Sequence, residues 1–186
     1  MNWKLFVPAI LCTFATGIVH GATPQGNTEQ RCGIMSKEPA QMVFAKVDDQ
    51  QPWKEYKRVE DIAELSLGFG ISAEAWTGRN HALLIRTVEP GEDFTAYTEY
   101  CFDPGGHLVH LAYELRTAWG WGFRTGGPVM GGAIHTDSKE FFSTENEKPT
   151  PKPEAANDVR DALKPSMYLT LDRLPFSKLL LGKRPN

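Results

Sequence analysis

The sequence predicts an α+β domain: a twisted, mainly antiparallel sheet of about five to seven strands, with two helices packed on one face. Several short segments alternate apolar and polar residues and are separated by turn residues, which is typical of antiparallel strands. Two other segments, residues 52–65 and 153–164, repeat apolar residues at spacings of three and four, which is the helical period.

Residues 1–21 are predicted to be a secretory signal peptide. Lys4 provides a positive charge, and residues 5–19 form an apolar stretch that is too short to span a membrane. Cleavage after Gly21 fits the preference for small residues best, and cleavage after Ala22 is the alternative. Lipidation at Cys12 is disfavoured because the bulky Leu11 precedes it. The chain is therefore expected to be secreted or periplasmic.

The charge of the chain argues against nucleic acid and anionic lipid as partners. Removing residues 1–21 leaves 19 basic and 23 acidic residues, a net charge of −4. The sequence has no basic run that would bind phosphates, so nucleic acid is not an expected partner. No later apolar run is long enough for a transmembrane segment. The predicted organisation is a loosely ordered arm at 22–40, a single domain at 41–181 and a tail at 182–186.

Two cysteines, Cys32 and Cys101, remain after cleavage of the signal peptide. In an oxidising compartment the simplest expectation is that they pair with each other. Closing a loop of about 70 residues stabilises a fold by roughly 4 kcal/mol in the chain-entropy model. A redox-active pair is the less favoured alternative, because such cysteines are usually close in sequence.

The strands expected on either side of residues 94–124 follow from short patterns of apolar and polar residues. Leu83, Leu84 and Ile85 are apolar on both faces, which indicates a central strand. Residues 126–132 are expected to be a loose connection, 145–152 a polar linker, and 174–176 an anchor for the chain end. The expected strands are residues 41–47, 71–77, 81–88 and 133–143, with a last strand through Met167, Leu169 and Leu171.

Residues 94–124 are predicted to form a long hairpin around a four-residue turn at 103–106. This register places Phe102 opposite His107, Tyr100 opposite Val109 and Glu99 opposite His110. One face is then almost wholly apolar and the other polar. The second strand keeps its alternation over sixteen residues, a span of roughly 50 Å, whereas a domain of this size has a radius of gyration near 15 Å. A bend or bulge is therefore expected at residues 118–122.

The apolar face of this hairpin gives the first candidate site. Trp119 and Trp121 alternate with glycines, and Tyr113 lies on the same face. Such a row of aromatic residues can be a stacking platform for a ligand. The favoured interpretation is that these residues continue the core.

The polar face gives the second candidate site. It carries Glu99, His110, Glu114 and Arg116, and carboxylates beside a histidine are the groups that general acid–base catalysis uses. The favoured interpretation is an ordinary solvated or helix-covered face, because surface charge pairs on antiparallel sheets are far commoner than catalytic clusters; a binding surface is the next alternative. His107 and His110 have a spacing that chelates metals on a helix, but on a strand they point to opposite faces. No metal site and no cofactor are predicted.

The leading functional hypothesis is a non-enzymatic domain of the cell envelope or extracellular space that binds an unknown small molecule or protein. The alternatives are a small hydrolase that uses the Glu99, His110 and Glu114 face, and a structural accessory protein of the envelope.

The export prediction is tested by sequencing the amino terminus of the secreted protein. We expect it to begin at Ala22 or Thr23, because signal peptidase cuts after small residues. A mature protein that retains Met1 would contradict export.

Overall fold

The structure is a computed structural model, and it describes residues 29–30, 32–33, 39–48, 50–62, 70–78, 80–136, 138–154, 156 and 164–182. The predicted signal peptide, most of the arm at 22–40 and most of the predicted helix at 153–164 lie outside these residues.

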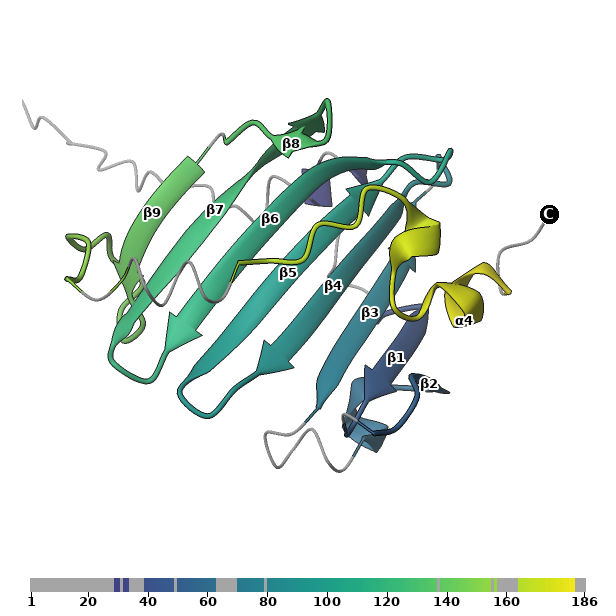
Figure 1. Cartoon of the computed structure of the whole chain (residues 1–186), viewed down its shortest axis with the longest axis horizontal. Helices are drawn as coiled ribbons and strands as arrows, with labels where there is room; N and C mark the ends of the chain where they lie inside the picture. The colour runs from purple at the N-terminus through teal and green to yellow at the C-terminus, as the bar shows by residue number, and fades with distance from the viewer. Residues whose placement is uncertain are drawn as a thin grey trace, which may run out of the picture.

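The described residues form one antiparallel sheet of nine strands, in the order β2-β1-β3-β4-β5-β6-β7-β8, with β9 also pairing with β7 (Figure 1). From β3 to β8 each strand pairs with the next strand in sequence, which is the arrangement of a meander. Strand β1 lies between β2 and β3. The strands are β1 (Met42–Lys46), β2 (Lys54–Tyr56), β3 (Ile71–Thr77), β4 (Leu83–Pro90), β5 (Phe94–Phe102), β6 (Leu108–Thr117), β7 (Trp121–Met130), β8 (Ala133–Ile134) and β9 (Ser138–Ser143).

Helix is scarce in the described residues. Its complete elements are two 3-10 turns, η1 (Val59–Asp61) and η2 (Leu171–Arg173), and the short helix α4 (Ser177–Leu181). A few further described residues, among them Cys32 and Ala156, are also helical. The antiparallel sheet is confirmed. The described residues are dominated by the sheet and do not show two helices packed on one face; most of the helix expected at 153–164 lies outside them. The sheet has more strands than the five to seven expected.

The face that the carboxyl-terminal segment crosses, here called the front face, carries the main core (Figure 1). Strand alternation places one set of side chains on this face, because successive residues of a strand point to opposite sides. Leu83, Leu84 and Ile85 are all buried, which confirms that β4 is a central strand covered on both sides. The buried sheet residues of the front face include Phe44, Ala73, Ala75, Leu83, Ile85, Tyr100, Phe102, Leu111, Tyr113, Leu115 and Phe123.

Residues 164–181 cover part of the front face. Phe176 stacks on Phe44 with 5.1 Å between the ring centroids, and Leu174 is also buried, so the anchor expected at 174–176 is present. The strand expected through Met167, Leu169 and Leu171 is wrong. Met167 and Leu169 are exposed, and Leu171 begins η2.

The β5–β6 hairpin keeps the predicted faces but not the predicted register. The loop holds five residues between the pair Phe102 and Leu108, one more than expected. Cys101 then pairs with His110, which leaves Val109 as a bulge, and Tyr100 pairs with Leu111 instead of Val109. One extra loop residue and one bulge residue shift the register by two, so each side chain beyond the bulge stays on its expected face.

The five-residue loop has a local cause. The Asp103 side chain accepts a hydrogen bond from the His107 amide at 2.8 Å, and the Asp103 amide donates to the His107 carbonyl at 2.9 Å. Gly106 adopts a φ of +81°, which residues with a β-carbon rarely take. His107 then pairs with Thr170 of the carboxyl-terminal segment rather than with Phe102.

The bend expected at residues 118–122 is instead a complete reversal of the chain. Strand β6 ends at Thr117, Gly120 has a φ of +85°, and β7 begins at Trp121. The comparison of strand length with domain size therefore located a real interruption of the strand. The alternation of apolar and polar residues alone did not distinguish one bent strand from two paired strands. Residues 126–130 belong to β7, so the loose connection expected from 126 onward is wrong up to Met130.

Two further segments differ from expectation at the sheet edges. The helix expected at 52–65 is wrong for its described part: Lys54–Tyr56 is strand β2, because it pairs with the free edge of β1 through Val43 and Tyr56. The single edge strand expected at 133–143 is two strands, β8 and β9, which both pair with β7.

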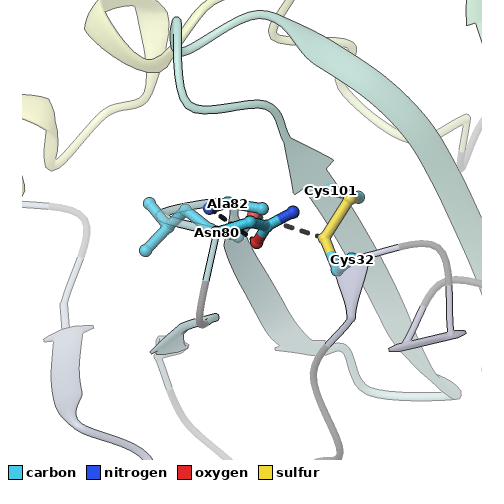
Figure 2. Close-up of a disulfide and its surroundings, with 5 residues drawn as sticks. Cys32, Asn80, Ala82 and Cys101 are labelled. Carbon is cyan, nitrogen blue, oxygen red and sulfur yellow. Dashed lines mark hydrogen bonds between the residues drawn. A yellow bond between two sulfur atoms is a disulfide. The ribbon is translucent and has the colours of Figure 1, made fainter.

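The predicted disulfide is present. Cys32 and Cys101 are joined with a Cα–Cα distance of 5.7 Å, next to the β3–β4 turn that holds Asn80 and Ala82 (Figure 2). Both cysteines are buried with Trp76 on the side of the sheet opposite the carboxyl-terminal segment, here called the back face. Separately, none of the helices in the described ranges is long and apolar enough to cross a membrane.

The bulge gives a test of the hairpin register. Val109 is 38% exposed and Leu111 is fully buried. We expect Leu111→Asp to lose about 3 kcal/mol or more of the free energy of unfolding, because it buries a charge in the core. Val109→Asp is expected to lose less than about 1 kcal/mol. Urea denaturation of both variants measures the difference, and equal losses would contradict the bulge.

Candidate functional site

A cavity of about 200 Å³ lies between the front face of the sheet and residues 164–176. It is referred to below as the front cavity. Residues of strands β3, β4, β5 and β6 form its floor, and residues of the carboxyl-terminal segment form its roof. Figure 1 shows this segment crossing the front of the sheet. Its lining residues are Trp53, Ile71, Thr87, Glu89, Phe94, Ala96, Thr98, Tyr100, Tyr113, Lys164, Pro165, Ser166, Tyr168, Pro175 and Phe176.

The floor of the front cavity carries a row of hydroxyl groups. Thr87 pairs with Thr98 across β4 and β5, and Thr98 pairs with Tyr113 across β5 and β6. Cross-strand partners lie side by side on one face, so the three hydroxyl-bearing side chains are adjacent. Threonine and tyrosine hydroxyls both donate and accept hydrogen bonds, so this row can bind either kind of polar group.

Aromatic rings form the walls. Trp53, which immediately precedes β2, packs against Phe176 with 4.8 Å between the ring centroids. Tyr168 packs against Tyr100 at 5.8 Å. These pairs join the sheet and its edge to the carboxyl-terminal segment, and Phe94 at the start of β5 completes the aromatic lining.

A hydrogen bond fixes the roof over the floor. The Tyr100 hydroxyl donates to the Ser166 carbonyl at 2.8 Å. Burial raises the pKa of Tyr100 and of Tyr113 well above the ordinary value, so both side chains stay protonated and neutral. The floor therefore offers neutral hydrogen-bonding groups rather than charges.

The two charged residues of the lining, Glu89 and Lys164, are both exposed and carry opposite signs. Both side chains therefore meet solvent, while the hydroxyl row below them is largely shielded from it. The Glu89 carboxylate contributes to the raised pKa of Tyr113, after the larger effect of burial. The site is charged at its opening and neutral inside.

Another hollow, of about 380 Å³, lies at the β1–β2 edge. Its lining residues are Gln41, Glu55, Tyr56 and Lys57, and all except Tyr56 are exposed. A ligand there would remain largely in water, so the front cavity is the stronger candidate.

The structure separates the three aromatic residues expected to form a stacking platform. Tyr113 lines the front cavity, but neither tryptophan does. Trp121 is buried against Phe141 in the core, as the favoured interpretation expected. Trp119 is 55% exposed in the β6–β7 turn, with its ring centroid 6.3 Å from that of Trp121.

The polar residues expected to be solvated lie on the back face and are mostly buried. Glu99 and His110 are each 1% exposed and Glu114 is 5% exposed, so of the two expected alternatives, a solvated or a helix-covered face, the solvated one is wrong for these three. Arg116 remains partly exposed. None of the four lines the front cavity.

Glu99 is held by Arg86 on the neighbouring strand. Arg86 donates to Glu99 Oε1 through Nε at 3.0 Å and through Nη2 at 2.7 Å. Nη2 also contacts Glu29 at 3.4 Å, close to the disulfide at Cys32. This arrangement ties the amino-terminal segment to the sheet. Burial raises the pKa of Glu99, and the nearby Arg86 opposes that shift.

Glu114 belongs to a second ionic cluster on the back face. Arg116 pairs with Glu114 at 2.6 Å and with Glu147 at 2.6 Å. Arg124 also contacts Glu147, and its guanidinium lies 3.9 Å from the centroid of the Phe142 ring. Both arginines hold the turn after β9 against the sheet, which is a structural role.

Metal binding has no support among the described residues, where no three His, Cys, Asp or Glu side chains are grouped closely enough to hold an ion. His107 is exposed beside Asp103 in the hairpin loop, and His110 is buried.

Sequence reasoning missed most of the front cavity. One usable signal was Thr87 and Glu89, polar residues at inward positions of a strand predicted to be central. Thr98 interrupts the apolar face of β5 in the same way. The roof gave a misleading signal, because the alternation of Met167, Leu169 and Leu171 predicted a strand that the structure does not contain.

No protein-family model, no curated protein and no solved structure matches this chain. The front cavity must therefore be interpreted from its own residues.

The Arg86–Glu99 pair gives a stability test. We expect Arg86→Met to lose about 2 to 3 kcal/mol of the free energy of unfolding, less than for a fully buried pair because Arg86 is partly exposed. The double variant Arg86→Met/Glu99→Gln should recover most of this loss, because no buried charge is left unpaired. Urea denaturation measures both, with the exposed Glu55→Gln as a control.

The stability that Arg86→Met loses should depend on pH in a defined direction. A raised pKa means that the folded chain holds the Glu99 proton more tightly than the unfolded chain does. Protonated Glu99 therefore favours folding at low pH, and this contribution is lost as the pH rises from the ordinary carboxyl pKa through the raised one. The deficit of Arg86→Met should shrink on acidification through that window, and a deficit that grows would contradict the assignment.

Proposed function

We propose that the chain is an exported protein that binds a small organic molecule in the front cavity. The observation that carries this proposal is an aromatic-walled cavity of about 200 Å³ with a row of hydroxyls on its floor. Binding sites for small molecules are typically concave and largely apolar, with a few placed polar groups that orient the ligand.

The size of the cavity supports a small ligand. An engineered protein cavity of about 150 Å³ binds benzene, whereas sites for drug-sized molecules enclose about 300–1,000 Å³. A cavity of about 200 Å³ therefore suits a molecule of one or two rings.

Export is supported by the predicted signal peptide and by the disulfide. The Cys32–Cys101 bond is compatible with an extracellular or periplasmic protein, because disulfides persist in oxidising compartments.

The other hypotheses gain no specific support. A hydrolase acting through the Glu99, His110 and Glu114 face would need substrate to reach side chains that are at most 5% exposed. The hypothesis of a structural envelope accessory protein has no observation in its favour.

Filling the cavity tests the proposal. Ala96 lines the floor between Glu89 and Leu115, so Ala96→Phe places a ring in the ligand space. A fragment library screened by thermal shift should give ligands that raise the Tm of the natural chain. At about 100 times its Kd, a ligand stabilises by roughly 2.7 kcal/mol, and each kcal/mol is about 2–4 °C for a chain of this size. Ala96→Phe should abolish these shifts.

Two controls make the result interpretable. Thr95→Val changes the same strand on the back face and should leave the shifts intact. Far-ultraviolet circular dichroism of Ala96→Phe checks that the sheet is formed. Equal shifts in the filled and natural chains would contradict binding in the front cavity.

A further inference from the structure

The hydroxyl groups on the floor of the front cavity are paired within the chain. The Tyr100 hydroxyl donates its proton to the Ser166 carbonyl at 2.8 Å. Burial raises the pKa of Tyr100 most, and hydrogen bonds with the side chains of Thr98 and Thr87 act in the opposite direction. Because the single proton of Tyr100 goes to Ser166, the two threonines are the donors in these bonds. Tyr113 is not without a partner either.

This pairing leaves few hydrogen-bond donors for a ligand. A threonine hydroxyl has one proton, and the protons of Thr87 and Thr98 are both used by Tyr100. A ligand oxygen that approaches these groups as an acceptor would leave water without gaining a hydrogen bond from them. Burying an unpaired polar group costs free energy. The floor therefore disfavours a ligand that brings an acceptor oxygen against it.

The charged residues of the lining lie only at the opening. Glu89 and Lys164 carry opposite signs and are exposed. Inside, Tyr100 and Tyr113 stay protonated and neutral, because burial raises the pKa of both. An ionised ligand group in the interior would lose its water without gaining a buried partner of opposite sign. The lining therefore favours an uncharged ligand.

The walls favour a ligand with an aromatic ring. Six of the lining residues are aromatic, and they come from β5, β6, the segment before β2 and the carboxyl-terminal segment. Stacked and edge-to-face contacts between rings gain free energy beyond the area that they bury. A ring between these walls can make such contacts on more than one side. The six residues are Trp53, Phe94, Tyr100, Tyr113, Tyr168 and Phe176.

We infer that the ligand is an uncharged, apolar aromatic molecule that places no hydrogen-bond acceptor against the floor formed by Thr87, Thr98 and Tyr100. This inference rests on the proposed binding function and names its ligand class. The hydrogen bonds of the floor hold the roof in place through Ser166 and are not used for the ligand, whose ring lies between the aromatic walls.

Three probes with one benzene ring test the class: ethylbenzene, acetophenone and phenylacetate. Isothermal titration calorimetry of the natural chain measures their Kd values. We expect ethylbenzene to bind tightest. Acetophenone has a carbonyl in place of one methylene of ethylbenzene, and it should bind roughly 5-fold or more weakly because this oxygen is buried without a donor. The anionic phenylacetate should bind at least about 10-fold more weakly than ethylbenzene.

The variant Tyr100→Phe tests the cause of this preference. It removes the acceptor of both threonine hydroxyls and so frees their protons for a ligand. The ratio of the acetophenone Kd to the ethylbenzene Kd should fall roughly 2- to 10-fold, because the acetophenone oxygen can then accept a hydrogen bond. The ratio cancels any loosening of the roof, which affects both probes. The matched control, Tyr97→Phe, makes the same change on the back face of the same strand and should leave the ratio unchanged.

A wall variant tests the aromatic part of the inference. Tyr168→Leu keeps an apolar side chain and removes a ring from the lining, so it should weaken ethylbenzene roughly 2- to 10-fold. Trp119→Leu is the control, because Trp119 is an exposed aromatic residue outside the cavity lining, and it should not alter the Kd. An unchanged Kd in Tyr168→Leu would contradict the aromatic requirement.

The outcomes separate the ligand class from the binding function. The ligand class is wrong, and the cavity remains a binding site, if Ala96→Phe abolishes probe binding but acetophenone or phenylacetate binds as tightly as ethylbenzene. An unchanged Kd ratio in a folded Tyr100→Phe variant also contradicts the class, and if this variant does not fold, the comparison of the probes in the natural chain decides alone.

Two further results are decisive. The ligand class is wrong if none of the probes binds while the fragment screen still yields ligands whose binding Ala96→Phe abolishes. If Ala96→Phe leaves probe binding unchanged, the binding function fails and the ligand class fails with it.

Discussion

The contact of Phe176 with Phe44 and Trp53 is the interaction on which the front of the molecule depends. It fixes the carboxyl-terminal segment against the edge of the sheet, while the Tyr100–Ser166 hydrogen bond fixes the same segment over the centre. Between these two attachments Leu171 and Leu174 are also buried in the main core. The front cavity is the space left between the sheet and residues 164–176. The cavity is thus produced by where the segment is attached, and the sheet itself needs no irregularity to form it.

The two faces of the sheet are both buried, but by different chemistry. The front face buries aromatic and aliphatic side chains under residues 164–181. On the back face, Arg86 pairs with Glu99, and Arg116 and Arg124 contact carboxylates of the second ionic cluster. Glu99 is 1% exposed, and a pair with so deeply buried a member contributes modestly to stability but is costly to break. The amino-terminal segment is held by the partly exposed Arg86–Glu29 contact and by the disulfide.

The sequence predicted the strands and their faces well where alternation is strong, and failed where tertiary contacts decide. The faces of β5 and β6 were correct because Val109 and the extra loop residue together restore the parity. Polarity misled on the back face, because Glu99 and Glu114 look like surface residues in isolation, yet both are buried and each contacts an arginine. The segment at 54–56 has helical spacing, yet the open edge of β1 makes it a strand. In the carboxyl-terminal segment the alternation of Met167, Leu169 and Leu171 predicted a strand, whereas the folded chain crosses the sheet there without forming one.

The attachment of Phe176 to Phe44 also constrains the order of folding. These residues are separated by 132 positions, and contacts between such distant residues form late because a long loop must close first. As the chain is synthesised, the strands emerge well before the segment that covers their aromatic face. That face is therefore exposed to other chains or to chaperones until the carboxyl-terminal segment packs on it. This exposure makes aggregation during synthesis the main hazard for this architecture.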